Sequence, residues 1–386
     1  MVELKYRFLV TAFFAVIGFV PASQVVFEWT QGDRPVVAEL VLNVPAEQHL
    51  RDVEDEIEET SWFARNSRSL ARNIWFPLSG EPGSNVLVGR DGWLFYLPTV
   101  RFLVESFPPG KDRQPDFQDP FAAIIDFHRQ LADRGIQLLV VPVPGKASIY
   151  PERVSSRADP EGIADSSHTL EFISQLNDAG IPTIDLFGTF HQERRRDRST
   201  NGEPLYLSQD THWTPEGAGL AAQAVAQRVL REGWVTAGSK EYAQKPVIAA
   251  RRSDILRMAR SPSIERLFPP QEVTCRQVFE SDTGNLYQDD PDSPVLVLGD
   301  SFLRIYQTDN PKAAGFLAHL ARNLRRPVAS IVNDGGASTL VRQQLSRNPD
   351  LLEDKKLVVW EFVERDLRFG LEGWQKISIP SNSSRQ

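Results

Sequence analysis

Three residues in two short stretches of this sequence have the types and the spacing for acyl-transfer chemistry. Ser301 follows the apolar run 295–298 and the turn-prone residues Gly299 and Asp300. An apolar run of this kind predicts a strand buried on both faces, and catalytic groups on such sheets lie at the carboxyl ends of strands. A serine there is placed as a nucleophile. The alternative is an ordinary strand-to-helix connection with Ser301 near a helix N-cap.

The second stretch is Asp210-Thr211-His212, in which an acid precedes a histidine by two residues. In extended backbone, this spacing places both side chains on one side of the chain. Asp210 would then orient His212 through one ring nitrogen, and the other would accept a proton from Ser301. The Thr-Pro pair at 214–215 predicts a helix start directly after the loop. An Asp-x-His pair alone is common, so the predicted Ser–His–Asp site rests on both stretches together.

These motifs resemble those of the SGNH-hydrolase superfamily. Ordinary members carry the serine near the N-terminus and an Asp-x-x-His near the C-terminus, whereas this chain runs Asp210, His212, Ser301 with one residue inside the Asp–His pair. That order resembles the alginate O-acetyltransferases of the AlgJ and AlgX type. Further support comes from the stretches 88–96 (VGRDGWLFY), 141–146 (VPVPGK) and 360–362 (WEF).

The resemblance, which covers roughly residues 80–370, implies an α/β fold. We expect an SGNH-like three-layer sandwich with a mostly parallel central sheet and a permuted order of catalytic elements. It also implies that the protein moves an acetyl group through a serine acyl-enzyme onto an exported polysaccharide such as alginate. A separate membrane-bound O-acyltransferase is the implied partner that supplies the acetyl group.

Two other functions stay open, because water or a sugar hydroxyl can resolve the same acyl-enzyme. One is an SGNH-type carbohydrate esterase that releases acetate. The other is a non-catalytic polysaccharide-binding component of the same assembly. The polymer also stays open, because a net charge of −8 suits an anionic alginate only if the cleft is locally basic.

The remaining candidate site residues stand near strand ends. The oxyanion of the tetrahedral intermediate needs backbone donors, for which we expect the N–H of Ser301 and that of Gly335 or Gly336, after the strand expected at 328–332. Asp300 is expected to be structural, because Asp210 is better spaced to serve His212. Three side chains are candidates for substrate binding, although each has an ordinary alternative in packing or solvation: Lys146, Arg304 and Tyr306.

The composition is that of an ordinary globular protein, with 41% hydrophobic and 24% charged residues among 386. The acidic balance argues against nucleic acid as a partner. The single cysteine, Cys275, excludes an internal disulfide and gives no support for a thiolate zinc site, and the six histidines show no metal-ligand spacing. We therefore expect no metal and no cofactor.

The N-terminus predicts export. Lys5 and Arg7 precede the apolar run 8–20, which is typical of a secretory signal. Counted through Phe27, the run would span a bilayer, and we slightly favour an uncleaved anchor on the periplasmic side of the bacterial inner membrane. The expected organisation is a signal anchor or signal peptide at 1–27, a polar helical spacer at 28–83, a catalytic domain at 84–375 with an irregular insertion at 233–293, and a disordered tail at 376–386.

Alternating segments within the catalytic domain predict βαβ units. A hairpin is expected at 86–96 with its turn at 90–92. Helices are expected at 121–134, 169–179, 215–231, 312–325 and 338–347, and strands at 136–143, 181–186, 295–298, 328–332 and 357–360.

Overall fold

The computed structural model describes Val25, Trp29, Thr30 and residues 85–105, 119–158, 167–200, 203–258, 268–370 and 372–380. The chain divides into two compact units, Met1–Glu81 and Pro82–Gln386, and all elements named below belong to the second. The predicted anchor and spacer lie almost entirely outside the described residues. Among the described residues, no helix combines the length and the apolar character that crossing a membrane requires.

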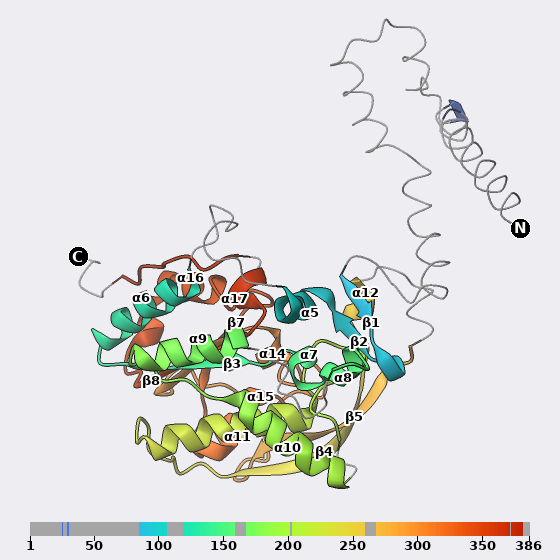
Figure 1. Ribbon diagram of the computed structural model, residues 1–386. Coiled ribbons are helices and arrows are strands. Elements are labelled where there is room, and N and C mark those ends of the chain that lie inside the picture. The colour runs from blue at the N-terminus through green and yellow to red at the C-terminus, as the bar shows by residue number, and fades with distance from the viewer. Residues whose placement is uncertain are drawn as a thin grey trace, which may run out of the picture. The chain divides into compact units, whose positions relative to one another are not determined.

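Four parallel strands form the central sheet of the second unit (Figure 1). In spatial order they are β3 (Gln137–Val143), β8 (Leu357–Val363), β6 (Val295–Gly299) and β7 (Ala329–Val332). Strands β6 and β8 are buried along their whole length, which explains why they are almost entirely apolar; β8 carries one charged residue, Glu361. The expected α/β fold with a mostly parallel central sheet is therefore confirmed.

Helices cover both faces of this sheet, in three layers (Figure 1). On one face, Phe127 packs edge-on against Trp360 of β8 at 5.2 Å between ring centroids, and on the other Trp213 stacks on Phe316 at 5.9 Å. The first face carries α6 (Pro120–Ala132), α9 (Ser167–Asp178), α16 (Leu340–Arg347) and α17 (Asp366–Phe369). The second carries α10 (Leu186–Thr200), α11 (Pro215–Arg231) and α15 (Phe316–Leu324).

Shorter elements surround the carboxyl ends of the strands. The predicted hairpin is present as β1 (Val86–Val88) and β2 (Leu94–Tyr96), joined by the 3-10 turn η1 (Arg90–Gly92) and followed by α5 (Leu97–Val104). Four short helices follow strand or loop ends: α7 (Lys146–Ile149), α8 (Pro151–Val154), α12 (Asp254–Met258) and α14 (Ser301–Arg304). A second 3-10 turn, η2, spans Pro349–Leu352.

Three expectations need correction. The strand expected at 181–186 is reduced to a single bridge between Thr183 and Val140, because Pro182 has no N–H to donate to a ladder. The region 233–293 is not irregular, since it contains a two-stranded antiparallel sheet of β4 (Tyr242–Arg251) and β5 (Gln271–Glu280). Within the tail expected to be disordered at 376–386, residues 376–380 are described, and the Ile379 N–H donates to the side chain of Gln130 at 2.7 Å.

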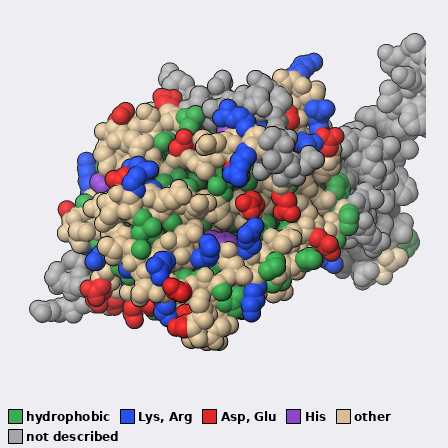
Figure 2. Space-filling view, turned by 90° about the horizontal axis from the view of Figure 1, so that it is seen from below, with side chains coloured by type: hydrophobic (Ala, Val, Ile, Leu, Met, Phe, Trp, Pro, Cys, Tyr) green, Lys and Arg blue, Asp and Glu red, His purple; other side chains and the backbone are tan. Residues whose placement is uncertain are grey.

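The face that carries α10, α11 and β4 shows charges of both signs. Figure 2 shows Lys and Arg side chains interspersed with Asp and Glu on this side rather than gathered into one basic patch. A cavity of about 360 Å³ opens there, with Arg196, Arg276 and Arg322 balanced by Glu193, Glu203 and Glu216. The visible surface on this side therefore offers no single-sign groove for a polyanion.

Candidate active site

Ser301 begins α14, directly after the last residues of β6. Asp300 caps this helix, because its Oδ1 accepts a hydrogen bond from the Phe302 N–H at 2.8 Å. A side chain at Gly299 would collide with Oε2 of Glu361 and with Leu303, so only glycine fits where the strand turns into the helix. The Gly-Asp-Ser sequence thus makes a tight turn that leaves Ser301 partly exposed at the carboxyl edge of the sheet.

The loop that carries the histidine is closed by backbone pairing. Tyr206 and Trp213 form an antiparallel bridge, and the Leu207 N–H donates to the His212 carbonyl at 3.1 Å. Thr214 then caps α11 through a hydrogen bond from the Gly217 N–H at 3.3 Å, as the Thr-Pro pair predicts. These contacts hold residues 208–211 as a short loop that is buried or half-buried.

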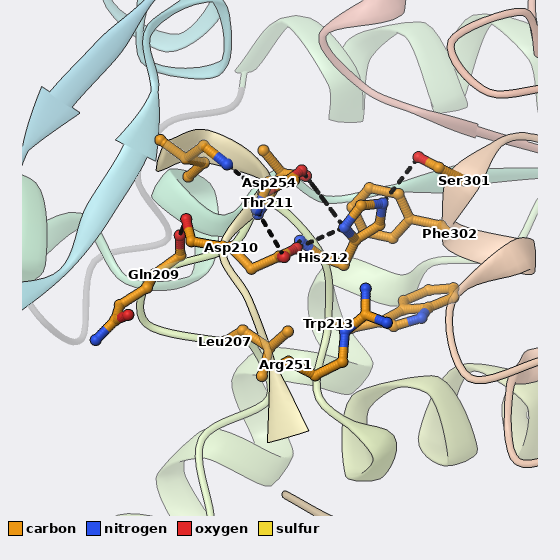
Figure 3. A network of polar contacts seen from close by, with 12 residues as sticks. Leu207, Gln209, Asp210, Thr211, His212, Trp213, Arg251, Asp254, Ser301 and Phe302 are labelled. Atoms are coloured by element: carbon orange, nitrogen blue, oxygen red, sulfur yellow. Dashed lines mark hydrogen bonds and ion pairs between the residues drawn. The ribbon is translucent and has the colours of Figure 1, made fainter. Parts of the chain in front are cut away.

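The structure brings Ser301, His212 and Asp210 together in the predicted order of contacts (Figure 3). His212 Nε2 lies 2.8 Å from Ser301 Oγ, and its Nδ1 lies 2.6 Å from Asp210 Oδ1. The same Asp210 oxygen accepts the His212 backbone N–H at 3.1 Å. Both side chains are buried, whereas the serine is only partly so. This geometry is suited to proton transfer from the serine hydroxyl to the imidazole.

The two buried partners shift each other's proton affinity. Burial alone would lower the pKa of His212, but the charge of Asp210 and its hydrogen bond outweigh burial and raise it. Burial alone would raise the pKa of Asp210, but His212 holds it below its usual range. Asp210 therefore stays ionised, and the imidazole has an enhanced affinity for the serine proton.

A further carboxylate, Asp254, also reaches the histidine and was not predicted. Its Oδ2 lies 3.6 Å from His212 Nδ1, and its backbone N–H donates to Asp210 Oδ2 at 3.1 Å (Figure 3). Asp254 starts α12 in the expected insertion, 44 residues after Asp210. No local pattern links these two acids, so only tertiary structure could reveal the contact.

Asp210, His212 and Asp254 are also the kind of residues that hold metal ions. One ligand atom from each lies within 4.8 Å of the other two. However, Asp210 Oδ1 stands at hydrogen-bond distance from the ring N–H of His212, and a cation would have to displace that proton. The arrangement suits a hydrogen-bonded group better than a metal site, and the absence of a metal stays a prediction.

Comparison with known proteins identifies the relatives of this chain. Residues 86–364 match the family model described as "SGNH hydrolase-like domain, acetyltransferase AlgX". The chain belongs to this family.

Named relatives agree with that assignment. A Pseudomonas putida protein named "Probable alginate O-acetylase AlgJ" is 30% identical over 312 residues, which cover 78% of this chain and 76% of the relative. The solved O-acetyltransferase domain of Pseudomonas putida AlgJ has a TM-score of 0.57 at 27% identity, covering 74% of this chain and 93% of the domain. Pseudomonas aeruginosa AlgX has the same fold, with a TM-score of 0.51 at 20% identity over 72% of this chain and 62% of AlgX.

Lys146, expected at the substrate, has a different place in this member of the AlgX-type family. Its side chain is buried, and Nζ donates to the carbonyls of Leu207, Ser208 and Asp210 at 3.0, 3.1 and 2.7 Å. The ammonium also lies 5.0 Å from the ring centroid of Phe95. Burial lowers its pKa to about 7, although Asp210 and Asp254 oppose that shift. Lys146 therefore supports the loop of the acid–base pair and does not face a substrate.

The two other candidates for substrate binding, Tyr306 and Arg304, make contacts within the protein instead. Tyr306 is fully buried, and its hydroxyl donates to the Trp213 carbonyl at 3.3 Å, so this residue cannot contact a substrate. Arg304 is partly exposed near Ser301, but its guanidinium is paired with Asp334 at 2.8 Å and with Asp309 at 2.5 Å. An acceptor would have to compete with both carboxylates for Arg304.

The two glycine candidates for the oxyanion site are distinguished by their backbone. The Gly336 N–H already donates to the Asn333 carbonyl at 2.9 Å, which closes the turn after β7. This corrects the expectation for Gly336. Gly335 adopts a left-handed conformation with φ of 70° at the same sheet edge as Ser301 and stays a candidate.

Beneath Ser301 lies another pair of buried acids, Asp300 and Glu361, the latter from the WEF stretch. The Asp300 N–H donates to Glu361 Oε2 at 3.1 Å. Asp300 Oδ2 and Glu361 Oε1 have no hydrogen-bond partner, and both residues are fully buried. Burial raises the pKa of each, against the opposing charge of Arg365. These acids brace the turn before the serine, consistent with the structural role expected for Asp300.

Proposed function

We propose that this protein is an exported O-acetyltransferase that moves an acetyl group through Ser301 onto hydroxyls of an exopolysaccharide such as alginate. The observation that carries the proposal is the pair of contacts from Ser301 through His212 to Asp210, at 2.8 and 2.6 Å. Family membership supports acyl transfer, and the printed names of the relatives support alginate as the acceptor.

In the first half-reaction, Ser301 Oγ attacks the acetyl carbonyl of the donor while Nε2 of His212 takes the serine proton. Such base assistance typically accelerates the step by about 10²–10⁴-fold. The N–H groups of Ser301 and Gly335 stabilise the oxyanion, where one missing donor costs about 10²–10³ in rate. The intermediate then collapses, the leaving group takes the proton from His212, and acetyl-Ser301 remains.

In the second half-reaction, a sugar hydroxyl gives its proton to His212 Nε2 and attacks the acetyl carbonyl of acetyl-Ser301. Collapse of this second intermediate returns the proton to Ser301 and releases the O-acetylated polymer. Water in place of the sugar would yield acetate, which is the reaction of the alternative esterase. The chain order Asp210, His212, Ser301 delivers the same roles in an order permuted from that of ordinary SGNH hydrolases.

The location follows from the N-terminal sequence. Lys5 and Arg7 before the apolar run 8–20 support an anchor with its positive end in the cytoplasm and the catalytic domain on the periplasmic side of the inner membrane. A membrane-bound O-acyltransferase would then supply acetyl groups from across the membrane. The anchored position would keep Ser301 near that supplier.

The test uses the full chain in detergent with an activated acetyl ester and a panel of oligosaccharides, read by mass spectrometry. Ser301→Ala and His212→Ala are compared with Ser281→Ala, which removes an exposed serine after β5. A gain of acetyl on sugar that depends on Ser301 and His212 supports transfer. Acetate release with no acetylated sugar would instead support the esterase. The absence of any activity that depends on Ser301 or His212 would remove the proposed triad as evidence and favour the binding component.

A further inference from the structure

Asp254 gives His212 a second carboxylate from outside the predicted motif. Its Oδ2 stands 3.6 Å from Nδ1, the nitrogen that already faces Asp210, and only 9% of its side chain is exposed. The Asp254 backbone N–H binds the Asp210 oxygen that His212 does not use. One residue therefore contacts both members of the acid–base pair.

The hydrogen bonds to Asp254 favour its ionised form. Oδ1 accepts the backbone N–H of Thr211 at 2.9 Å and that of Ile255 at 2.7 Å, and Oδ2 accepts the Thr211 hydroxyl. Donors to both oxygens stabilise a carboxylate and leave little room for an acidic proton. Burial and the charge of Asp210 act in the opposite direction and raise its pKa. Against these two effects act the positive charge on His212 and the three donors, two of which belong to Thr211.

We infer that Asp254 is a positioning residue of the proposed acyl transfer: it is ionised, it fixes Asp210 and Thr211, and its charge stabilises the imidazolium form of His212. The inference rests on the proposed function only for its effect on rate. The contacts of Asp254 and the effect of its charge on His212 do not depend on which reaction the protein catalyses.

Besides Asp254, four charged groups act on His212 or on its two acids. Asp210 is the nearest, and Asp300, in its ionised form, adds a weaker field from the turn before Ser301, although burial favours its neutral form. Lys146 faces the two acids from the start of α7, and Arg251 faces Asp210 from the end of β4. Because these groups stay in place when Asp254 is neutralised, any change in the proton affinity of His212 reports on Asp254.

Substitution Asp254→Asn removes the charge and keeps the shape of the side chain. The pKa of His212, followed by ¹⁵N NMR of labelled imidazole nitrogens in the full chain, is expected to fall by about one unit or more, as for loss of an opposite charge within 4–6 Å. Asp126→Asn is the matched control, because Asp126 is a half-buried acid of α6, which packs on the far face of the sheet. An unchanged pKa of His212 in Asp254→Asn would show that Asp254 is neutral and would overturn the inference.

Kinetics separate positioning from simple loss of structure. His212 must be neutral to act as a base, so activity rises as the pH passes upward through its pKa. In Asp254→Asn this rise should move to lower pH, while the plateau of kcat/KM falls about tenfold, equivalent to one pKa unit of lost imidazolium stabilisation. A lower plateau with an unmoved rise would contradict the electrostatic role. If no transferase activity exists at all, the NMR titration still decides the inference.

A measurement on the unsubstituted protein covers the case in which Asp254→Asn does not fold. The ¹³Cγ resonance of Asp254 is expected to be that of a carboxylate at neutral pH. A carboxylic acid resonance there would overturn the inference without any variant.

Discussion

Two pairs of buried acids stand on either side of the proposed reaction, and they are built differently. Asp210 and Asp254, beside His212, have hydrogen-bond donors on their oxygens. Asp300 and Glu361, beneath Ser301, each leave one oxygen without a partner. Burial raises the pKa of both, as it does that of Asp254, but Asp254 has donors on both oxygens that oppose this shift. The first pair is equipped to hold negative charge, and the second is not.

The difference matches where charge develops during acyl transfer. A positive charge forms on His212 when it takes the serine proton, and a carboxylate beside it is stabilising. A negative charge forms on the carbonyl oxygen near Ser301, and ionised acids beneath the serine would oppose it. Burying Asp300 and Glu361 with few donors keeps the rigid turn while withholding that charge. The contrast predicts that neutralising an acid is damaging in the first pair and mild in the second.

The largest effect is expected for Asp210→Asn. The amide cannot stabilise the imidazolium and can hold the wrong tautomer of His212, so kcat should fall by about 10³–10⁴-fold. The rate of Ser301 acetylation in a single turnover, followed by mass spectrometry, measures it. A fall in kcat of less than tenfold would mean that Asp210 does not orient His212. It would contradict the expectation that neutralising an acid of the first pair is damaging.

Lys146→Met tests the support of the first pair. The substitution removes the ammonium from the carbonyls of Leu207, Ser208 and Asp210, of which Ser208 keeps the Leu94 N–H as a donor. We expect a loss of about 3 kcal/mol in the free energy of unfolding, since each of the two carbonyls left unsatisfied costs about 1–3 kcal/mol. Urea denaturation at neutral pH gives the value. A loss under about 1 kcal/mol would show that water replaces the ammonium.

Lys146 also predicts a pH dependence of stability. Its pKa is about 7 in the folded protein against 10.5 for an ordinary lysine. Between these values the unfolded chain binds more protons, so this group makes stability rise with pH, by up to about 1.4 kcal/mol per unit. The rise should be present in the unsubstituted protein and missing in Lys146→Met. Parallel curves for the two proteins would contradict the lowered pKa.

Glu361→Gln tests the second pair. An amide copies a neutral acid, so kcat should stay within about threefold of the unsubstituted rate. A raised folded pKa contributes stability that is present below the unfolded value and lost as pH rises. Above the pKa of an unfolded glutamate, the unsubstituted protein should therefore lose stability relative to the variant as the pH rises, by up to about 1.4 kcal/mol per unit. A fall in kcat as large as that of Asp210→Asn would contradict the expectation that neutralising an acid of the second pair is mild.

Tyr306→Phe is the reference with the smallest expected effect, because Tyr306 belongs to neither pair. Its hydroxyl makes a single long hydrogen bond to the Trp213 carbonyl. We expect a loss of about 0.5–1.5 kcal/mol in the free energy of unfolding and an unchanged KM for the acceptor. A raised KM would show that Tyr306 contributes to binding of the acceptor.

Much of the fold could be predicted because its central strands are buried on both faces. The runs at 295–298 and 357–360 have no polar face, which is typical of a covered parallel sheet. The antiparallel β4–β5 pair was missed because β4 alternates exposed and half-buried residues and contains Pro246, which interrupts the expected pattern. Its pairing with β5 depends on contacts that a local pattern does not encode.

The site was predictable to the extent that local motifs carry it. The spacing of Asp210 and His212 and the turn before Ser301 each leave a signature, and the structure joins them. Asp254 and Lys146 act through tertiary contacts about 40–60 residues away along the chain. A lysine after a strand is usually solvated, whereas this one is buried beside Trp93 and Phe95 and against the carbonyls of the 207–210 loop.

The loop at 207–212 is tied to four segments that lie far apart in the chain. The Leu94 N–H donates to Ser208, Lys146 binds its carbonyls, Asp254 binds Asp210, and Gln271 accepts the Ser208 N–H. Contacts of such long sequence separation slow folding, because the entropy of loop closure must be overcome before they form. The acid–base pair is therefore fully supported only when these four segments have come together around the loop. Activity of this protein would then report on completed folding, and an incompletely folded chain would be unable to form the reactive serine.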